Sequence, residues 1–169
     1  MKQISFASLF LLFPITAFGQ GQASLPPPAD TVAPDIPGVV AGGAQVRVVK
    51  YGFQGTEGPV ALPDGGILFT ETRANRITRV DPDGNASPFL ENANGSNGLG
   101  FDPNRRLISV QTTPGQTKVG VLHPKGSEAV LADRYEGQPL KRPNDLVVDT
   151  RGGVYFSDSP GIYYIPPGG

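Results

Sequence analysis

The sequence contains no cysteine and only one histidine. The absence of cysteine excludes a disulfide framework, a thiolate metal site and a cysteine nucleophile. Charged residues are also scarce, at 17% of 169 residues, and the net charge is −1. That balance argues against a nucleic-acid-binding protein, because such proteins usually carry a basic stripe. The single histidine, His123, stands in a His-Pro-Lys-Gly turn signal, so no Ser/His/Asp triad is expected.

Long hydrophobic runs are missing as well, since no stretch reaches the roughly 18 apolar residues of a membrane span. The longest candidate is Ile4–Phe18, which is mostly apolar and is interrupted by Pro14. This run is typical of a secretory signal peptide, and Ala17-Phe18-Gly19 predicts a cleavage that removes residues 1–19. The alternative is a buried N-terminal helix, which Pro14 would break. We therefore expect a periplasmic or extracellular protein with no membrane attachment after cleavage.

Glycine and proline are abundant, with 23 Gly and 18 Pro, about twice the usual share. Many of them fall in residues 20–44, a Pro/Gly/Ala-rich segment that we interpret as a tether. Because proline fixes φ and removes a backbone donor, we expect no regular structure before about Val46.

From Val46 onward, short β-branched segments alternate with turn signals, as expected of antiparallel strands joined by hairpins. A segment that begins at Glu57-Gly58-Pro59 recurs 40 residues later, beginning at Asn97-Gly98-Leu99. A third copy begins at Asn144-Asp145-Leu146, a further 47 residues along the chain. A second predicted strand follows within each copy, and these strands are Arg76–Val80, Lys118–Leu122 and Gly161–Ile165.

A repeat of about 40–45 residues made only of strands is the signature of a β-propeller blade. We therefore predict an all-β fold, a β-propeller, with about three blades in residues 45–169. The alternative is a two-sheet sandwich with coincidental hairpin spacing. Because closed propellers typically have about four to eight blades, we expect this chain to be a fragment of a longer protein, unless another copy of the chain closes the ring.

Three polar residues, Glu57, Asn97 and Asn144, occupy the same position in the three repeats. The first strand of each blade lines the axis of a propeller, so equivalent positions at its entrance converge on one point. One carboxylate and two amide carbonyls are hard oxygen ligands, which suit Ca²⁺ or Mg²⁺. The asparagines could instead be turn residues, since Asn tolerates the left-handed conformation. For Glu57, an unpaired carboxylate among apolar residues would be costly, which favours a functional role.

Three motifs carry a family resemblance: Gly55-Thr56-Glu57-Gly58-Pro59-Val60, Asn97-Gly98-Leu99, and Arg142-Pro143-Asn144-Asp145 before a strand that ends in Ser157-Asp158. With these motifs the chain from about residue 46 to 169 resembles the N-terminal portion of the SMP-30/gluconolactonase/LRE-like family, the regucalcin group. The resemblance implies a six-bladed propeller that hydrolyses lactones of sugar acids. It also implies a divalent cation, with Ca²⁺ as the first choice and Mg²⁺, Zn²⁺ or Mn²⁺ as alternatives.

The resemblance assigns roles to single residues. Glu57 corresponds to the family's first metal ligand, and Asn144 to the asparagine of its second ligand motif. Arg142 resembles the substrate-contacting arginine, and Asn97 falls where bacterial members have an Asn-Gly near the substrate pocket. The family's general-base aspartate has no counterpart in this sequence, so the catalytic residue is unknown.

The implied function is that of a secreted, metal-dependent lactone hydrolase whose substrate is a small lactone or sugar acid. Two alternatives stay open: a non-enzymatic propeller that binds a sugar or peptide, and a strictosidine-synthase-like propeller without this metal chemistry. The segment Gln111-Thr112-Thr113 departs from the Glu-His-Gly-like segment of many bacterial members. We therefore expect a different wall beside the substrate.

Overall fold

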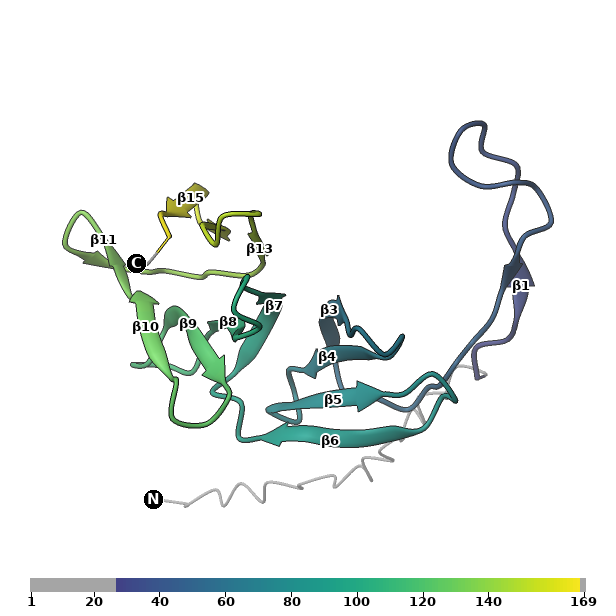
Figure 1. The fold of residues 1–169 in the computed structure, drawn as a ribbon, viewed down its shortest axis with the longest axis horizontal. Helices are drawn as coiled ribbons and strands as arrows, with labels where there is room; N and C mark the ends of the chain where they lie inside the picture. The colour runs from purple at the N-terminus through teal and green to yellow at the C-terminus, as the bar shows by residue number, and fades with distance from the viewer. Residues whose placement is uncertain (1–26, 168–169) are drawn as a thin grey trace, which may run out of the picture.

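The computed structural model describes residues 27–167, in which the named elements are all β-strands (Figure 1). The strands are β1 (Thr31–Val32), β2 (Gln45–Val46), β3 (Thr56–Ala61), β4 (Ile67–Glu71), β5 (Arg76–Val80), β6 (Ala86–Glu91), β7 (Ser96–Phe101), β8 (Leu107–Gln111), β9 (Lys118–His123), β10 (Ala129–Ala132), β11 (Arg134–Tyr135), β12 (Gln138–Pro139), β13 (Leu146–Val148), β14 (Val154–Asp158) and β15 (Gly161–Ile165). The predicted signal peptide, residues 1–19, lies outside the described residues. A search of the described range finds no helix long and apolar enough to cross a membrane.

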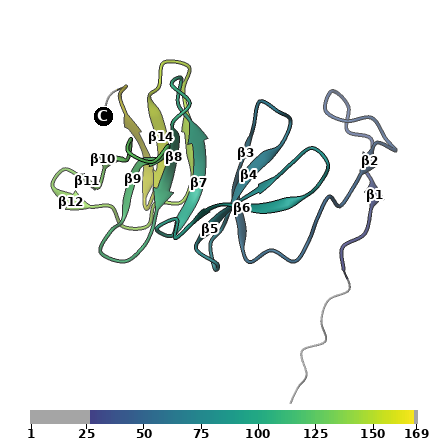
Figure 2. The same ribbon diagram turned by 60° about the horizontal axis from the view of Figure 1, so that its bottom comes forward.

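Three antiparallel sheets hold most of the chain, and each runs through strands that are consecutive in the sequence. Their orders are β3-β4-β5-β6, β7-β8-β9-β10 and β13-β14-β15. The sheets lie side by side (Figures 1 and 2), and β7 contacts both β3 and β13, the first strands of the neighbouring sheets. Up-and-down sheets packed around their first strands are blades of a β-propeller. The predicted all-β propeller fold is therefore confirmed.

The strands form where apolar and β-branched residues lie between glycine- and aspartate-rich turns. β5 and β15 have the predicted bounds, and β9 extends one residue beyond its prediction, to His123. In the turn between β3 and β4, the Gly66 N–H donates to Asp64 Oδ1 at 3.0 Å, and Gly65 adopts a φ of 89°. Glycine takes that left-handed conformation without a steric penalty. Local turn chemistry thus sets the hairpins that the sequence repeats.

Two hydrophobic clusters fill the spaces between neighbouring sheets. The cluster between the first and second sheets contains Leu68, Ile77, Ala93, Leu99 and Leu107. The cluster between the second and third sheets contains Ile108, Val110, Val119, Val121, Leu140, Val154, Phe156 and Ile165. Leu107 and Ile108 are adjacent in β8 yet belong to different clusters, because successive strand residues face opposite sides of a sheet. The second sheet is therefore covered on both faces.

The segment 20–44 contains more regular structure than we predicted. β1 pairs with β2, with Thr31 opposite Val46 and Val32 opposite Gln45, so the expectation of no regular structure before Val46 was wrong. The physical reason is that the prolines within 33–44 fall in the connecting loop and remove no donor from the ladder. The hairpin of β11 and β12 was not predicted either.

A buried carboxylate holds the first sheet together at one end. Oε1 of Glu71 accepts hydrogen bonds from Arg76 Nε at 2.8 Å and from the Thr78 hydroxyl at 2.6 Å. Oε2 accepts the backbone N–H of Gln54 at 2.8 Å. Burial by itself would raise the pKa of Glu71, but these hydrogen bonds outweigh it and hold the pKa below the ordinary 4.5. Glu71 is therefore ionised at neutral pH and fixes the chain that enters β3.

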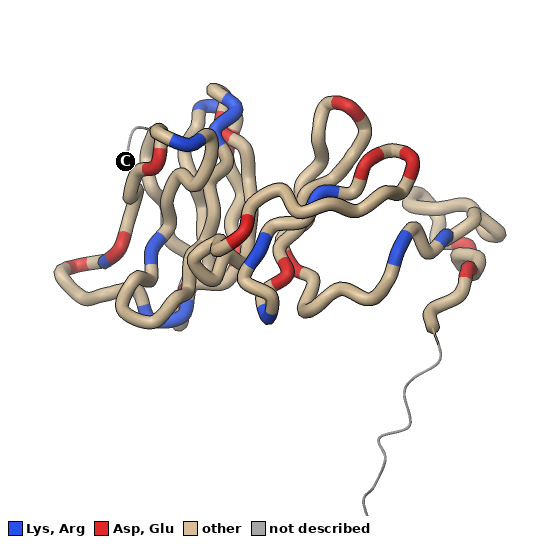
Figure 3. Tube along the Cα trace, turned by 90° about the horizontal axis from the view of Figure 1, so that it is seen from below, with Lys and Arg blue, Asp and Glu red and all other residues tan. Residues whose placement is uncertain are grey.

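Elsewhere, acidic and basic residues are interspersed along the chain (Figure 3).

We predict that Glu71→Gln lowers the free energy of unfolding by about 2 kcal/mol at neutral pH, because hydrogen bonds to a charged acceptor are lost. The pKa of Glu71 is lower in the folded than in the unfolded state. Its contribution is therefore present above pH 4.5 and disappears as the pH falls through the folded-state value. Urea unfolding of both proteins across this pH range measures the effect, with exposed Glu136→Gln as the control. A stability difference that does not shrink in acid would contradict the role given to the charge.

Candidate functional site

The starts of the three innermost strands carry the residues that the repeat singles out. Glu57 lies in β3, Asn97 lies in β7, and Asn144 precedes β13 by two residues. The hydroxyl of buried Thr70 lies 3.1 Å from the carbonyl oxygens of both Glu57 and Asn97. Thr70 therefore ties β3 to β7 at the level of these residues.

Asn97 and Asn144 are in direct contact. Nδ2 of Asn97 donates to Oδ1 of Asn144 at 2.8 Å, and the Gly98 N–H donates to the Asn144 carbonyl at 3.0 Å. Asn97 belongs to a strand, so the alternative that it is a turn residue was wrong. The left-handed turn conformation is adopted instead by Asn92 and Asn94, with φ of 55° and 52°.

Two glycines allow the innermost strands to approach each other this closely. A Cβ on Gly58 would lie 2.4 Å from the carbonyl oxygen of Asn97. A Cβ on Gly98 would lie 2.7 Å from the Cα of Asp145 and 2.8 Å from the backbone nitrogen of Leu146. All of these distances are shorter than van der Waals contact allows. The glycine that follows each candidate ligand in β3 and β7 is therefore required by backbone-to-backbone packing.

The strand pairing is irregular at the same place in both sheets. The register of β3 against β4 shifts between Glu57 and Val60, and the register of β7 against β8 shifts between Ser96 and Leu99. Such bulges bend a strand and re-aim its side chains. The repeat thus preserves a local distortion beside Glu57 and Asn97.

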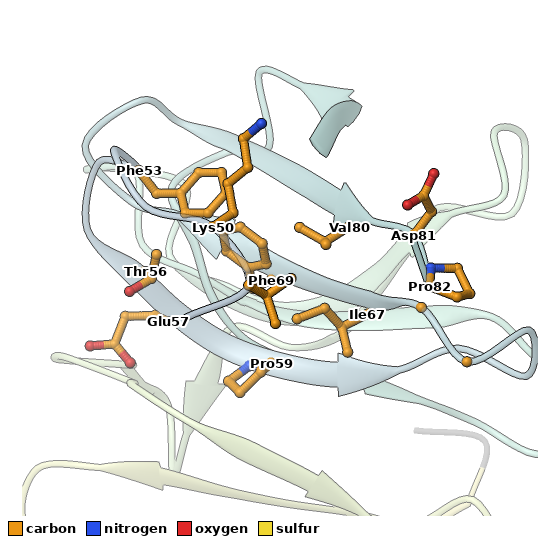
Figure 4. Close-up of a pocket in the computed structure, with 13 residues that line it drawn as sticks. Lys50, Phe53, Thr56, Glu57, Pro59, Ile67, Phe69, Val80, Asp81 and Pro82 are labelled. Atoms are coloured by element: carbon orange, nitrogen blue, oxygen red, sulfur yellow. The ribbon is translucent and has the colours of Figure 1, made fainter. Parts of the chain in front are cut away.

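The side chain of Glu57 is exposed, contrary to the expectation that it lies among apolar residues. Figure 4 shows Glu57 at the edge of a cavity of about 520 Å³, with its carboxylate pointing away from the rings of Phe53 and Phe69. Burial of its charge therefore gives no reason to assign a functional role to Glu57. The reason that remains is its position in the repeat, beside Asn97.

The cavity in Figure 4 is an apolar face of the first sheet. Its lining includes Phe53, Pro59, Ile67, Phe69 and Val80. Ile67 corresponds in the repeat to Leu107, 40 residues later, and Leu107 is packed between the first and second sheets. The cavity is thus the packing face of a blade that stays uncovered within residues 27–167.

Arg142 lies with Asn144 on a shallow hollow of about 430 Å³. Both side chains are exposed, and Pro143 between them is buried. The Arg142 backbone N–H donates to Asp158 Oδ1 at 2.6 Å, and the Lys141 N–H donates to Oδ2 at 2.8 Å. Asp158 therefore positions the loop that carries Arg142 and Asn144. In the third repeat it occupies the position that Glu71 has in the first and Gln111 in the second.

The side-chain oxygens at this site are of the type that a hard divalent cation binds, but there are too few of them to complete its coordination. Within the described range, no three His, Cys, Asp or Glu side chains come close enough to hold a metal ion. A cation here would depend on the carboxylate of Glu57 and the amide oxygens of Asn97 and Asn144. Because Ca²⁺ takes about six to eight oxygens, water and substrate oxygens would have to supply the remainder.

Fold and site together define a β-propeller whose innermost strands present oxygen-rich side chains at one end. A sequence profile of the SMP-30/Gluconolactonase/LRE-like region matches residues 55–160, and the chain belongs to this family. The gluconolactonase of Zymomonas mobilis subsp. mobilis is 30% identical over 130 residues, which cover 68% of this chain and 36% of that protein.

Solved structures agree with this assignment. A gluconolactonase from Xanthomonas campestris matches with a TM-score of 0.67 and 23% identity over 75% of this chain and 48% of that one, a likeness of fold. A second structure, of a protein ascribed to the gluconolactonases, matches with a TM-score of 0.57 and 32% identity over 66% of this chain and 39% of that one. The chain therefore spans between about a third and a half of the length of these relatives.

We predict that Gly98→Ala separates β7 from β13 and lowers the free energy of unfolding by about 1–3 kcal/mol, as overpacking does. The added Cβ would meet backbone atoms, which cannot rotate away. Gly161→Ala is the matched control, since a Cβ there meets only Tyr163 at 3.9 Å. Thermal unfolding of both variants measures the difference. Equal stabilities would show that the innermost strands are not in close contact.

Proposed function

We propose that the protein is a secreted, metal-dependent hydrolase of lactones, of the gluconolactonase type. The observation that carries the proposal is the meeting of Asn97 and Asn144 beside Glu57, at one end of three innermost strands. The family supports it, as does the curated relative whose name is gluconolactonase. The substrate class is a small cyclic ester of a sugar acid.

The chain's own residues would position the cation and the substrate. Glu57 supplies the negative charge that holds a divalent cation, with Ca²⁺ the first choice because all candidate donors are hard oxygens. Asn144 and Asn97 add amide oxygens, and their mutual hydrogen bond orients both side chains. The exposed guanidinium of Arg142, on the hollow that Asn144 also lines, would orient substrate hydroxyl or carboxylate groups through its planar donors.

Lactone hydrolysis breaks the ring ester bond and consumes one water. The water oxygen bonds to the carbonyl carbon, the ring C–O bond breaks, and the ring oxygen takes a proton to become a hydroxyl. A bound cation supplies stabilisation of negative charge on the carbonyl oxygen. A general base must take a proton from the water. No residue of this chain is assigned that role.

We predict that Glu57→Gln in the natural full-length protein weakens Ca²⁺ binding and lactone hydrolysis by at least about 100-fold, since even indirect support of a metal ligand is worth 10–100-fold. Calorimetric titration with Ca²⁺ and an assay on δ-gluconolactone measure the two effects. Glu91→Gln, an exposed carboxamide substitution at the end of β6, is the control and should leave both unchanged. Undiminished hydrolysis in Glu57→Gln would remove Glu57 from the site. Ca²⁺ binding without hydrolysis in the unaltered protein would favour a binding module.

Secretion is part of the proposal and has its own test. We expect the protein to be recovered outside the cytoplasm with Gln20 as its first residue, because Ala17-Phe18-Gly19 forms a small-x-small cleavage pattern. N-terminal sequencing of the fractionated protein checks this expectation. A protein that retains residues 1–19 in the cytoplasm would overturn it.

A further inference from the structure

A second cavity, of about 540 Å³, lies at the junction of the first and second sheets, and its lining includes none of Glu57, Asn97, Arg142 and Asn144. Two of its lining residues, Gln111 and Thr113, belong to the segment that we expected beside the substrate. Its polar lining includes Asn75, Asn94, Gln111, Thr113, Lys118 and Glu128. Asn75 lies in the loop between β4 and β5, Asn94 lies between β6 and β7, and the others belong to β8, β9 or the loops beside them. Both sheets therefore contribute to this cavity.

The repeat explains why the cavity exists in the second sheet. Gln111 of β8 stands where the first sheet has Glu71, and Lys118 opposite it stands where the first sheet has Arg76. Gly120 stands where the first sheet has Thr78, whose hydroxyl donates to Glu71. The second sheet thus lacks the Thr78 side chain and the Glu71–Arg76 ion pair that close this space in the first sheet.

The amide of Gln111 is left with an unused donor. Gln111 is 2% exposed, and its Oε1 accepts Asn94 Nδ2 at 2.9 Å. Its Nε2 is buried and has no hydrogen-bond partner among residues 27–167. Nε2 lies 3.5 Å from where a Cβ on Gly120 would stand, and the backbone of Ala129 in β10 also lies against that position. Buried polar groups in folded proteins are nearly always hydrogen-bonded to protein, water or a ligand, so this amide nitrogen is free to donate to a molecule that enters the cavity.

The chemistry of the lining selects an uncharged polyhydroxylated molecule. Carboxamides and a threonine hydroxyl provide both donors and acceptors, which hydroxyl groups match pairwise. Lys118 and Glu128 carry opposite charges, so the cavity favours neither anions nor cations overall. We propose that this cavity is a binding site for a neutral monosaccharide or alditol, with Gln111 Nε2 donating to one of its hydroxyl oxygens.

Calorimetric titration of the protein with D-glucose, D-galactose and sorbitol tests the proposal. We expect saturable binding of at least one of them, and Gln111→Met should weaken it at least tenfold, because Met keeps the length of the side chain without its donor. Gln138→Met, the same substitution on exposed β12, is the matched control and should bind as the unaltered protein does. Far-ultraviolet circular dichroism establishes that each variant is folded.

The outcomes that would overturn the proposal are distinct. Absence of saturable binding by all three compounds removes the site, and undiminished binding in Gln111→Met moves it elsewhere. If Gln111→Met does not fold, Thr113→Val decides, because it removes a hydroxyl at the half-buried edge of the cavity and should weaken binding at least threefold. Tighter binding of D-gluconate than of D-glucose would overturn the neutral character of the ligand.

Discussion

The arrangement depends on the backbone-to-backbone approach of the innermost strands. Where Gly58 meets Asn97 and Gly98 meets Asp145, no room is left for a side chain. That closeness lets the Thr70 hydroxyl reach the carbonyls of two strands, and it brings the amides of Asn97 and Asn144 within hydrogen-bonding distance. Polar residues that are 40 and 47 positions apart in the sequence consequently form one cluster. Sheet packing around the axis thus determines the geometry of the candidate site.

The strands could be predicted because their causes are local. Asp-Gly turns and alternating segments such as Arg76–Val80 specify hairpins without help from the rest of the chain. The β1–β2 hairpin could not be predicted, because each strand is only two residues long and lies in or beside a Pro/Gly/Ala-rich segment that indicated a tether. Short pairings of this kind depend on contacts such as the one between Val48 N–H and Asp30 Oδ1, which span 18 residues.

The candidate site was predictable as a set of positions but not as a set of contacts. The alignment of the three sequence repeats was enough to place Glu57, Asn97 and Asn144 at equivalent positions. Neither the bulges in β3 and β7 nor the exposure of Glu57 follows from the alternation of residues, since both depend on where one strand meets the next. The role of Asp158 as an acceptor for two backbone N–H groups was equally hidden, because backbone donors leave no trace in the sequence.

Glu71, Gln111 and Asp158 occupy equivalent positions in the three repeats, and their side chains make different hydrogen bonds. Glu71 pairs with Arg76 and Thr78, and Asp158 accepts the backbone of the loop that carries Arg142. Gln111 keeps one hydrogen bond and one unused donor. The first two arrangements are closed networks that stabilise the fold, because every polar atom of the carboxylate has a partner. The arrangement at Gln111 lowers stability in the unliganded protein, because the buried amide nitrogen has no partner among residues 27–167. The Gln111 side chain is as long as that of Glu71 but carries no charge, so it can hydrogen-bond a neutral hydroxyl compound. Divergence within the repeat, rather than its regularity, therefore locates the second binding site.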